Sequence, residues 1–263
     1  MINSNTEILK TEALSVGYQS KKNQVTVANN INLSMKKGEL VGLVGANGIG
    51  KSTLLRTLAN IQEALGGTIE INSKSLESYL APDLAKVLSL VLTEQLMSKN
   101  LSVYEMVALG RQPYTNWMGK LHENDMAIVD EAIKQTNSSN LKHKKCYELS
   151  DGQLQIIMIA RALAQDTQLI ILDEPTTHLD MYHKAYILNL LKKITKEIKK
   201  TILFSSHEID LAIQLCDKMI VMTNEKVISE TPTQLINTGV FENLFPKDLI
   251  AFDKELGRFR VRK

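Results

Sequence analysis

A phosphate-binding loop is the feature that most constrains the fold of this chain. Residues Gly45–Ser52 read GANGIGKS, which fits the pattern G-x-x-x-x-G-K-[ST] at every position. The apolar segment Leu40–Val44 precedes the loop, and a stretch of helical character runs from Lys51 to about Asn60. A strand, a glycine-rich loop and a helix in this order form the setting in which such a motif binds nucleotide phosphates. The sequence therefore predicts a nucleotide-binding α/β protein.

The residue types of the loop suit a triphosphate and its magnesium ion. Glycines let the backbone curl so that its N–H groups face the phosphates, and the start of the helix adds positive potential. Lys51 is expected to reach the β- and γ-phosphates, and the hydroxyl of Ser52 is expected to bind Mg²⁺. The predicted cofactors are therefore ATP and Mg²⁺. The predicted nucleotide contacts of the loop are Gly45, Asn47, Gly48, Gly50, Lys51, Ser52 and Thr53. The motif by itself does not separate kinases, GTPases and motor ATPases.

Two carboxylates follow a second apolar segment. Leu169–Leu172 is apolar, and Asp173 and Glu174 come directly after it. A parallel sheet places the carboxyl ends of its strands beside the phosphate loop. Asp173 is then expected to hold Mg²⁺ through a bound water, and Glu174 to act as the general base on the attacking water. Alone, such a pair would be read as two solvated acids, but beside a phosphate loop the catalytic interpretation is favoured.

Apolar strands alternate with helical stretches, which indicates a mostly parallel sheet with helices on both faces, as in a P-loop NTPase core. The predicted strands are Leu40–Val44, Thr68–Ile71, Val87–Leu92, Leu169–Asp173, Thr201–Ser205, Lys218–Met222 and Lys226–Ser229. The predicted helices are Lys51–Asn60, one capped by Ser102 and ending at Leu109, Asn124–Gln135, Gln153–Ala164, Met181–Lys200 and Glu208–Cys216. Glu105, three residues after Ser102, completes a capping box.

Two regions are expected to extend this core. Ile8–Tyr18 and Val25–Met35 alternate apolar and polar residues, which predicts an antiparallel β subdomain. Residues from about 94 to 165 are mostly helical in pattern and are predicted to form a helical lobe. The whole chain, 1–263, is interpreted as a single ATP-binding domain.

Two segments have a less regular pattern. Arg111–Lys120 carries Pro113 and Gly119 and is predicted to be a loop. The C-terminal segment, from Phe241 to Lys263, is predicted at most to pack as an edge strand, and its role stays open.

The charge balance and the apolar runs exclude several classes of protein. The 31 basic and 29 acidic residues give a net charge of +2, whereas a general nucleic-acid binder normally shows a strong basic excess. The longest apolar runs, Val87–Leu92 and Leu169–Leu172, fall far short of the roughly 20 residues that span a bilayer. Met1–Lys10 lacks the apolar core of a signal peptide. We therefore expect a cytosolic protein that is not itself a membrane channel and has no nucleic-acid partner.

A third motif carries a family resemblance. Leu149–Gln153 reads LSDGQ and is followed by Ile159–Leu163, IARAL. Together they resemble the signature loop and helix of the ATP-binding subunits of ABC transporters. Asp151 stands where the family more often has glycine, a change that importers of metal chelates in this family tolerate. Thr177–Asp180 resembles the family's loop that crosses the dimer interface, and Ser205–Glu208 resembles the segment that carries its switch histidine.

The resemblance implies a site shared between two subunits. In this family two copies pack head to tail, and the signature loop of one meets the γ-phosphate held by the other. That assigns nucleotide contacts to Ser150, Asp151, Gly152, Gln153 and Asp180, adenine stacking to Tyr18, and a catalytic contact with the γ-phosphate to His207. The other histidines show no ligand spacing and are expected to be surface or packing residues; they are His122, His143, His178 and His183.

One position of the family pattern is open in this sequence. The family usually has a glutamine at the end of the strand that we place at Val87–Leu92, where it contacts Mg²⁺ and the membrane partner. Here the residues are Thr93, Glu94 and Gln95. The distance to Leu101 favours Glu94, whereas the side-chain chemistry favours Gln95 as the metal contact.

The run Leu109–Tyr114, LGRQPY, resembles a segment of the importers of iron–siderophore complexes, haem and vitamin B12. In that group the helical lobe receives a short helix from a transmembrane permease, and a substrate-binding protein acts indirectly. The expected location is therefore the cytoplasmic face of the membrane, with the iron–siderophore assignment preferred. The alternatives are a soluble ABC ATPase or an exporter ATPase unconnected with metal chelates. Soluble members usually carry two cassettes or long coiled-coil insertions, and this chain has one phosphate loop and one signature.

Overall fold

The computed structural model describes residues 6–20, 23–92, 99–246 and 248–262. Its main sheet has six strands in the order β10-β9-β3-β8-β7-β6. Neighbouring strands are parallel except β9 and β10, which are antiparallel. The strands are β3 (Leu40–Gly45), β6 (Leu88–Val91), β7 (Leu169–Leu172), β8 (Thr201–Ser205), β9 (Lys218–Met222) and β10 (Val227–Glu230). The predicted α/β class and mostly parallel sheet are confirmed.

Both faces of this sheet are buried, which explains why its strands read as continuous apolar runs. Along β3, Leu40 and Val44 belong to a core that contains residues of the helices α5 (Asp151–Ala164), α6 (Met181–Lys193) and α7 (Ile209–Leu215). Val41 and Leu43 belong to a second core on the opposite face, with helix α1 (Lys51–Leu58). Helices therefore cover both faces, as predicted.

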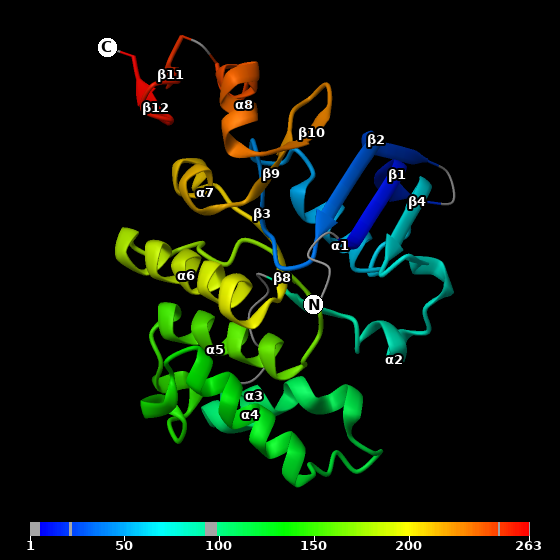
Figure 1. Cartoon of the computed structure of the whole chain (residues 1–263), viewed down its shortest axis with the longest axis vertical. Coiled ribbons are helices and arrows are strands. Elements are labelled where there is room, and N and C mark those ends of the chain that lie inside the picture. The colour runs from blue at the N-terminus through cyan, green and yellow to red at the C-terminus, as the bar shows by residue number, and fades with distance from the viewer. Residues whose placement is uncertain (1–5, 21–22, 93–98, 247, 263) are drawn as a thin grey trace.

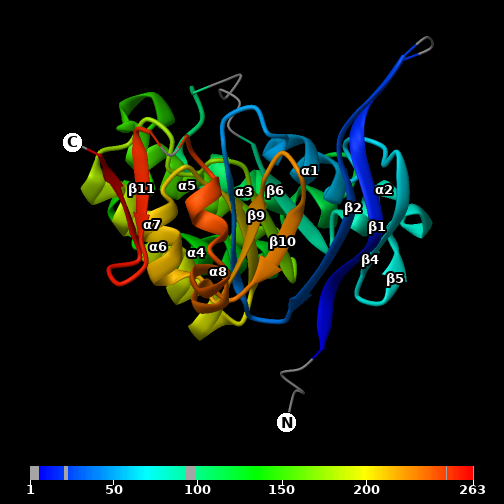
Figure 2. The same ribbon diagram turned by 90° about the horizontal axis from the view of Figure 1, so that it is seen from above.

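A second, antiparallel sheet packs over α1. Its order is β2-β1-β4-β5, and its strands are β1 (Glu7–Gln19), β2 (Gln24–Lys36), β4 (Gly66–Ile71) and the short β5 (Lys74–Ser75). Inward residues of β1 and β2 join the core that contains α1, so α1 lies between the two sheets (Figure 1). Strands β1 and β2 extend beyond the rest of the main body at one end (Figure 2).

Three helices pack on one another in the lower part of Figure 1: α3 (Val103–Ala108), α4 (Glu123–Gln135) and α5. The side chain of Ser102 caps α3 in a capping box with Glu105, as predicted. The division of the chain into a core and a lobe stays a prediction.

The predicted loop Arg111–Lys120 is wrong at its start, because a 3₁₀ helix, η2 (Leu109–Tyr114), occupies that position. The cause is the side chain of Arg111, which is 4% exposed. Its Nε donates to Asp125 of α4 at 2.9 Å, and one terminal nitrogen donates to the carbonyl of Ala164 at 2.9 Å. The guanidinium also lies over the ring of Tyr114, 3.9 Å from its centroid. One buried cation thus joins η2 to α4 and α5.

The helix predicted over Met181–Lys200 ends earlier than expected. After α6, residues Ile194–Ile198 form a π-helical turn, η5, and Lys199 then adopts a left-handed conformation with φ of 61°. The remaining helical elements are α2 (Ala81–Leu84), α8 (Pro232–Thr238) and the short 3₁₀ turns η1 (Leu76–Ser78), η3 (Ser139–Leu141), η4 (Cys146–Glu148) and η6 (Val240–Asn243).

The C-terminal segment does not add an edge strand to the main sheet, which corrects that prediction. Strands β11 (Ile250–Asp253) and β12 (Arg258–Val261) form a separate two-stranded sheet. The hairpin lies against α7, where the N–H of Phe259 donates to the carboxylate of Asp210 at 3.2 Å. Phe252 and Phe259 of the hairpin also contact the rings of Phe241 and Phe245, which follow α8.

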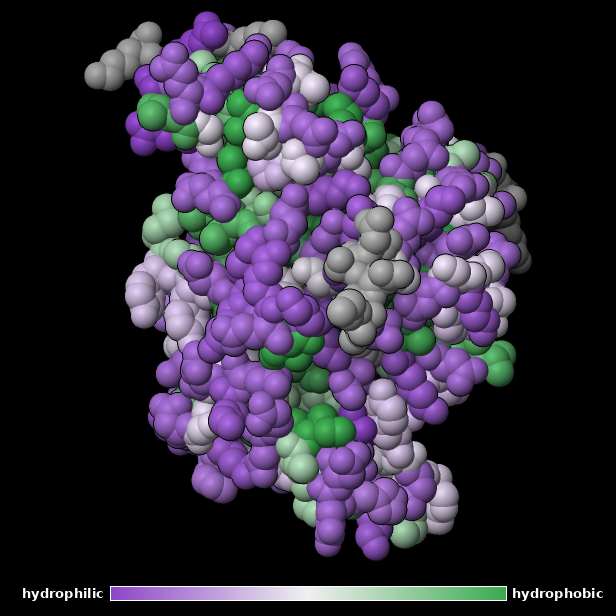
Figure 3. Space-filling model, viewed as in Figure 1, coloured by the Kyte–Doolittle hydropathy of each residue, from purple (hydrophilic) through white to green (hydrophobic). Residues whose placement is uncertain are grey.

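The surface is mainly hydrophilic on the face in Figure 3, with hydrophobic residues in small patches. Among the described helices, none combines the length and the apolar character needed to cross a membrane.

Candidate active site

The phosphate loop connects β3 to α1, as the sequence predicted. Gly50 immediately precedes α1 and has a φ of 109°, a conformation that favours glycine. A Cβ at this position would also overlap the side chain of Val27 on β2. Because Gly50, the N-cap residue, has no side chain to cap α1, it leaves the N–H groups of the first turn available to an anion.

Lys51 is the first residue of α1, and only 5% of its surface is exposed. Its Nζ donates to the carbonyl oxygens of Gly45 at 3.1 Å and Ala46 at 3.2 Å. Burial lowers the pKa of the Lys51 ammonium, while the nearby carboxylates of Glu174 and Asp173 act in the opposite direction. The loop therefore holds a lysine side chain among carbonyl and carboxylate oxygens, close to the position that phosphates would take.

Asp173 lies at the end of β7, beside the end of β8. The hydroxyl of Ser52 donates to its Oδ1 at 3.1 Å, and the hydroxyl of Ser205 donates to the same oxygen at 2.7 Å. A hydroxyl and a carboxylate are hard oxygen donors that suit Mg²⁺, which keeps several waters and takes phosphate oxygens as further ligands. Groups of three or more His, Cys, Asp and Glu that could enclose a metal do not occur among the described residues. The donor set therefore fits a metal that binds together with the nucleotide.

Glu174 is held by contacts to its backbone and to both carboxylate oxygens. Its backbone has a φ of 50°, in the left-handed region that non-glycine residues seldom adopt. Its N–H donates to the hydroxyl of Ser205 at 2.8 Å, and Thr177 donates to Oε2 at 3.0 Å. Nε2 of His207 lies 2.7 Å from Oε1. A strained residue held by several partners is a pattern found at active sites.

Ser205 was not singled out by the sequence. It ends the predicted strand Thr201–Ser205 and begins the segment Ser205–Glu208 that carries His207, and that position was the available signal. Its single hydroxyl donates to Asp173 and accepts from the N–H of Glu174, so it fixes both acidic residues relative to each other.

We expect Ser205→Ala to lower the rate of ATP hydrolysis by about tenfold, since one lost buried hydrogen bond at a transition state costs about 1–2 kcal/mol. Steady-state phosphate release at saturating ATP measures this. Ser89→Ala is the matched control, because Ser89 is also a buried serine of the main sheet but bonds to Thr167 instead. Equal rates for Ser205→Ala and wild type would exclude a positioning role for Ser205.

Tyr18 lies near the start of α1. Its hydroxyl is 2.8 Å from the hydroxyl of Thr53, while 56% of the residue is exposed. The ring therefore has an open surface close to the phosphate loop, which is compatible with the predicted stacking on adenine.

The signature residues begin α5. Ser150 caps this helix in a capping box with Gln153. Asp180 caps α6, where it accepts the N–H of His183 and contacts its Nδ1, both at 2.9 Å. A Cβ on Gly152 would lie 2.8 Å from Cδ2 of His183, so this histidine packs between the two helix starts. The polar contacts of Ser150, Gln153 and Asp180 remain within these two turns in the part of the chain that the structure describes, rather than reaching the phosphate loop.

Two predicted site residues cannot be placed. Glu94 and Gln95 lie outside the described residues, and the choice between them stays open.

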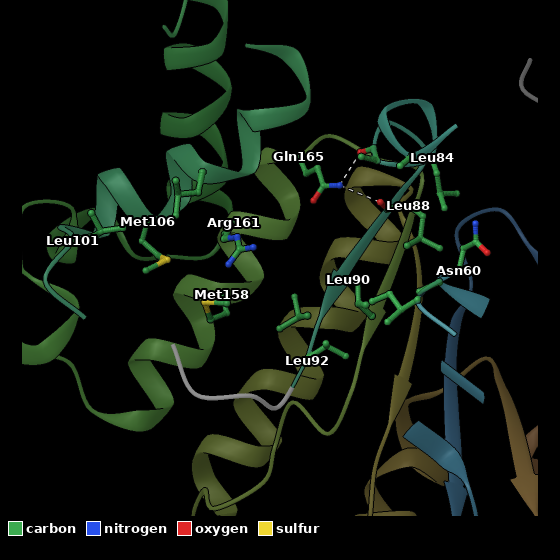
Figure 4. Close-up of a pocket in the computed structure, with 16 residues that line it drawn as sticks. Asn60, Leu84, Leu88, Leu90, Leu92, Leu101, Met106, Met158, Arg161 and Gln165 are labelled. Carbon is green, nitrogen blue, oxygen red and sulfur yellow. Dashed lines mark hydrogen bonds between the residues drawn. The ribbon is translucent and has the colours of Figure 1, made fainter. Parts of the chain in front are cut away.

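A groove of about 840 Å³ lies beside the site. One side comes from β6, α2 and the end of α1, and the other comes from α3, η2 and α5 (Figure 4). The labelled side chains Leu88, Leu90 and Leu92 lie on the sheet side, with Met106 and Met158 on the helical side. Gln165, near the end of α5, donates to the carbonyls of Ala85 at 2.7 Å and Leu88 at 3.0 Å and so connects the two sides.

Known proteins resemble this chain over most of its length. The family model described as ABC transporter matches residues 28–177. An uncharacterised ABC transporter ATP-binding protein of Methanocaldococcus jannaschii is 38% identical over 97% of this chain and 87% of the relative. The iron(3+)-hydroxamate import ATP-binding protein of Bacillus subtilis is 34% identical over 91% of this chain and 88% of the relative. A petrobactin import ATP-binding protein of Bacillus anthracis is 35% identical over 85% of this chain and 82% of the relative.

Solved structures agree with these relatives. An inward-facing ABC transporter assigned to the metal-chelate type has a chain that superposes with a TM-score of 0.77 at 27% identity, covering 91% of this chain and 89% of that one. A dimeric ATP-binding cassette bound to ADP and phosphate gives a TM-score of 0.72 at 26% identity, covering 86% of this chain and 99% of that one.

Proposed function

Because this chain belongs to the ABC transporter family of ATP-binding proteins, we propose that it is the ATP-hydrolysing subunit of an importer that takes up an iron–siderophore complex through a separate membrane permease. The observation that carries the ATPase part is the hydrogen-bonded group at the ends of β3, β7 and β8. It joins Ser52, Asp173 and Ser205, and through Ser205 it continues to Glu174 and His207.

In the proposed mechanism the loop N–H groups and Lys51 bind the phosphates, and the ring of Tyr18 binds adenine. Mg²⁺, held by Ser52 and Asp173 and contacted by Gln95 or Glu94, would neutralise charge on the phosphates. Glu174 accepts a proton from the attacking water, and His207 orients that water and the γ-phosphate. The contact between His207 and the Glu174 carboxylate favours this division of roles, since it keeps base and orienting group together.

A second copy of the chain would complete the site. The start of α5, with its Ser150 hydroxyl and N–H groups, is an anion-binding end of a helix. Within the described part of the chain, the polar contacts of Ser150, Gln153 and Asp180 stay within their own turns, which favours a helix start that faces a partner. The resemblance to a dimeric cassette supports head-to-tail pairing with ATP between the copies.

The membrane side of the proposal rests on the groove in Figure 4 and on the import relatives. The groove would receive a segment of the permease at the cytoplasmic face of the membrane, and a substrate-binding protein would deliver the chelate on the other side. Haem and cobalamin are the other candidate cargoes. A soluble or exporter ATPase remains the alternative, and the relatives named for iron(3+)-hydroxamate and petrobactin import favour the siderophore reading.

Uptake by the living host tests the assignment. The gene is deleted, and uptake of a labelled iron–siderophore, haem and cobalamin is measured with wild-type and Lys51→Ala copies restored. We expect loss of iron–siderophore uptake that wild type restores and Lys51→Ala does not. Unchanged uptake of all three compounds would remove the chelate-importer assignment and leave the ATPase assignment in place.

A further inference from the structure

His183 lies between the starts of two helices that carry different motifs. It is the third residue of α6, while Gly152 is the second residue of α5. Its Nδ1 lies 2.9 Å from each carboxylate oxygen of Asp180, and its backbone N–H donates to Oδ1 at 2.9 Å. A Cβ on Gly152 would lie 2.8 Å from Cδ2 and 3.5 Å from Nε2 of the same ring. One side of the imidazole therefore faces Asp180, and the other side faces α5.

Several contacts hold the ring in this orientation. An ionised carboxylate can only accept a hydrogen bond, so the Nδ1 that faces Asp180 carries a hydrogen. The N–H and the ring of His183 in turn lower the pKa of the Asp180 carboxyl, which keeps that group ionised near neutral pH. The ring of Tyr182 lies edge-on to the imidazole, with 5.4 Å between the centroids. Only 38% of the His183 side chain is exposed, so the ring is a packed part of the junction between the two helices.

The contact with His183 also explains the glycine at position 152. The backbone of Gly152 is helical, and its φ lies outside the left-handed region, so its conformation does not require glycine. Beyond the backbone of α5, the three nearest atoms that a Cβ would meet all belong to the ring of His183. The missing side chain thus lets the two helix starts approach until the imidazole separates them.

We propose that His183 is a positioning residue for the site that two copies of the chain share. Its ring sets the spacing between the starts of α5 and α6, so that Ser150 and Asp180 meet the second copy as one preformed surface. This inference rests on the head-to-tail pairing of the proposed function. His183 is given no contact with ATP, and its effect is on pairing rather than on the chemical step.

The test uses the Glu174→Gln variant, whose ATP-bound pairs should persist long enough to be counted by analytical ultracentrifugation. We expect His183→Ala, added to Glu174→Gln, to raise the ATP concentration for half-maximal pairing by at least about tenfold, because each pair loses a charge-assisted hydrogen bond and a spacer in both copies. Binding of a fluorescent ATP analogue by dilute, unpaired subunits should stay unchanged, as should the melting temperature. His143→Ala is the matched control, since it removes an exposed histidine between η3 and η4, and it should leave pairing unchanged.

Two further replacements separate the ring from its hydrogen bond. His183→Phe keeps a ring against Gly152 but cannot donate to Asp180. His183→Asn can still donate to Asp180 but has no ring to separate the helices. We expect His183→Phe to retain most of the pairing and His183→Asn to behave like His183→Ala. Wild-type pairing by His183→Asn would make the residue only a part of the α6 cap and would overturn the proposal.

Gly152→Ala tests the contact from the other helix. In a chain that keeps His183, the added methyl group should displace the ring and raise the ATP concentration needed for pairing. Combined with His183→Ala, the same methyl group should have a much smaller effect. An equal effect in both backgrounds would contradict the proposal.

The outcomes also separate this inference from the proposed function. If Glu174→Gln forms no pairs with ATP, the head-to-tail pairing is wrong and the inference fails with it. If Glu174→Gln forms pairs and His183→Ala leaves them unchanged, the role of His183 alone is wrong.

Discussion

Replacing Glu174 with glutamine is expected to lower ATP turnover by about a hundredfold to a thousandfold while leaving ATP binding intact, since a general base contributes about that much. Glutamine has the shape of glutamate, and its amide oxygen can still accept the hydrogen bond of Thr177. It cannot take a proton from water. The anion-binding loop and the signature helix remain, so ATP should hold two copies together. Phosphate release measures the loss, and size-exclusion chromatography with ATP and Mg²⁺ measures the trapped dimer.

Glu208→Gln is the matched control for this experiment. Glu208 lies one residue after His207 and pairs with Lys184 at 2.5 Å rather than with the Glu174 group. Its replacement should leave turnover within a few fold of wild type and should trap no dimer. Wild-type hydrolysis by Glu174→Gln would show that another group serves as the base.

Arg111→Met is expected to destabilise the fold by about 3–5 kcal/mol, because it leaves the buried carboxylate of Asp125 without its cation. The side chains of this pair are 4% and 7% exposed. The carbonyl of Ala164 also loses its donor. For a domain of this size the melting temperature should fall by roughly 10 °C, which differential scanning calorimetry of the nucleotide-free protein measures.

The control for Arg111 is Lys142→Met, which removes a more exposed pair with Asp130. Such a pair contributes at most about 1 kcal/mol, so the melting temperature should move by a few degrees at most. Arg111→Met combined with Asp125→Leu should recover part of the loss, because it removes the uncompensated charge. A melting temperature for Arg111→Met equal to that of Lys142→Met would contradict the role of Arg111 in joining η2 to α4 and α5.

The strands of the main sheet could be predicted closely from the sequence. Thr201–Ser205 and Lys218–Met222 have the predicted bounds. A strand that is buried on both faces consists mainly of consecutive apolar residues, so its ends are visible in the sequence. Helix ends were less accurate, as the π-helical turn after α6 shows, and the 3₁₀ helix η2 depends on contacts with residues far along the chain. Arg111 shows this directly, since Asp125 and Ala164 decide the conformation of its segment and no local pattern announces them.

In the candidate site, too, some residues could be predicted from the sequence and others could not. The residues of the motifs could be recognised because each motif has residues of a fixed type at fixed positions along the chain. Ser205 was missed because its task exists only once β7 and β8 are neighbours, when one hydroxyl can reach both Asp173 and the N–H of Glu174. The C-terminal hairpin was missed for a related reason. Its aromatic residues Phe252 and Phe259 find their partners only in the folded chain, where they contact Phe241 and Phe245.

Helix α5 connects the groove of Figure 4 to the helix start that carries the signature residues. Its 14 residues span about 21 Å, with Ser150 and Gln153 at the start and Gln165 just past the end. Gln165 attaches the far end to the backbone of Ala85 and Leu88 beside the groove. A continuous helix shifts or tilts as a unit, so a displacement imposed at the groove arrives at the anion-binding start without passing through a flexible segment. If the permease docks in the groove and the nucleotide of a second copy meets the start of α5, as proposed, a movement can pass between them through the backbone of one helix, without a relay of side chains.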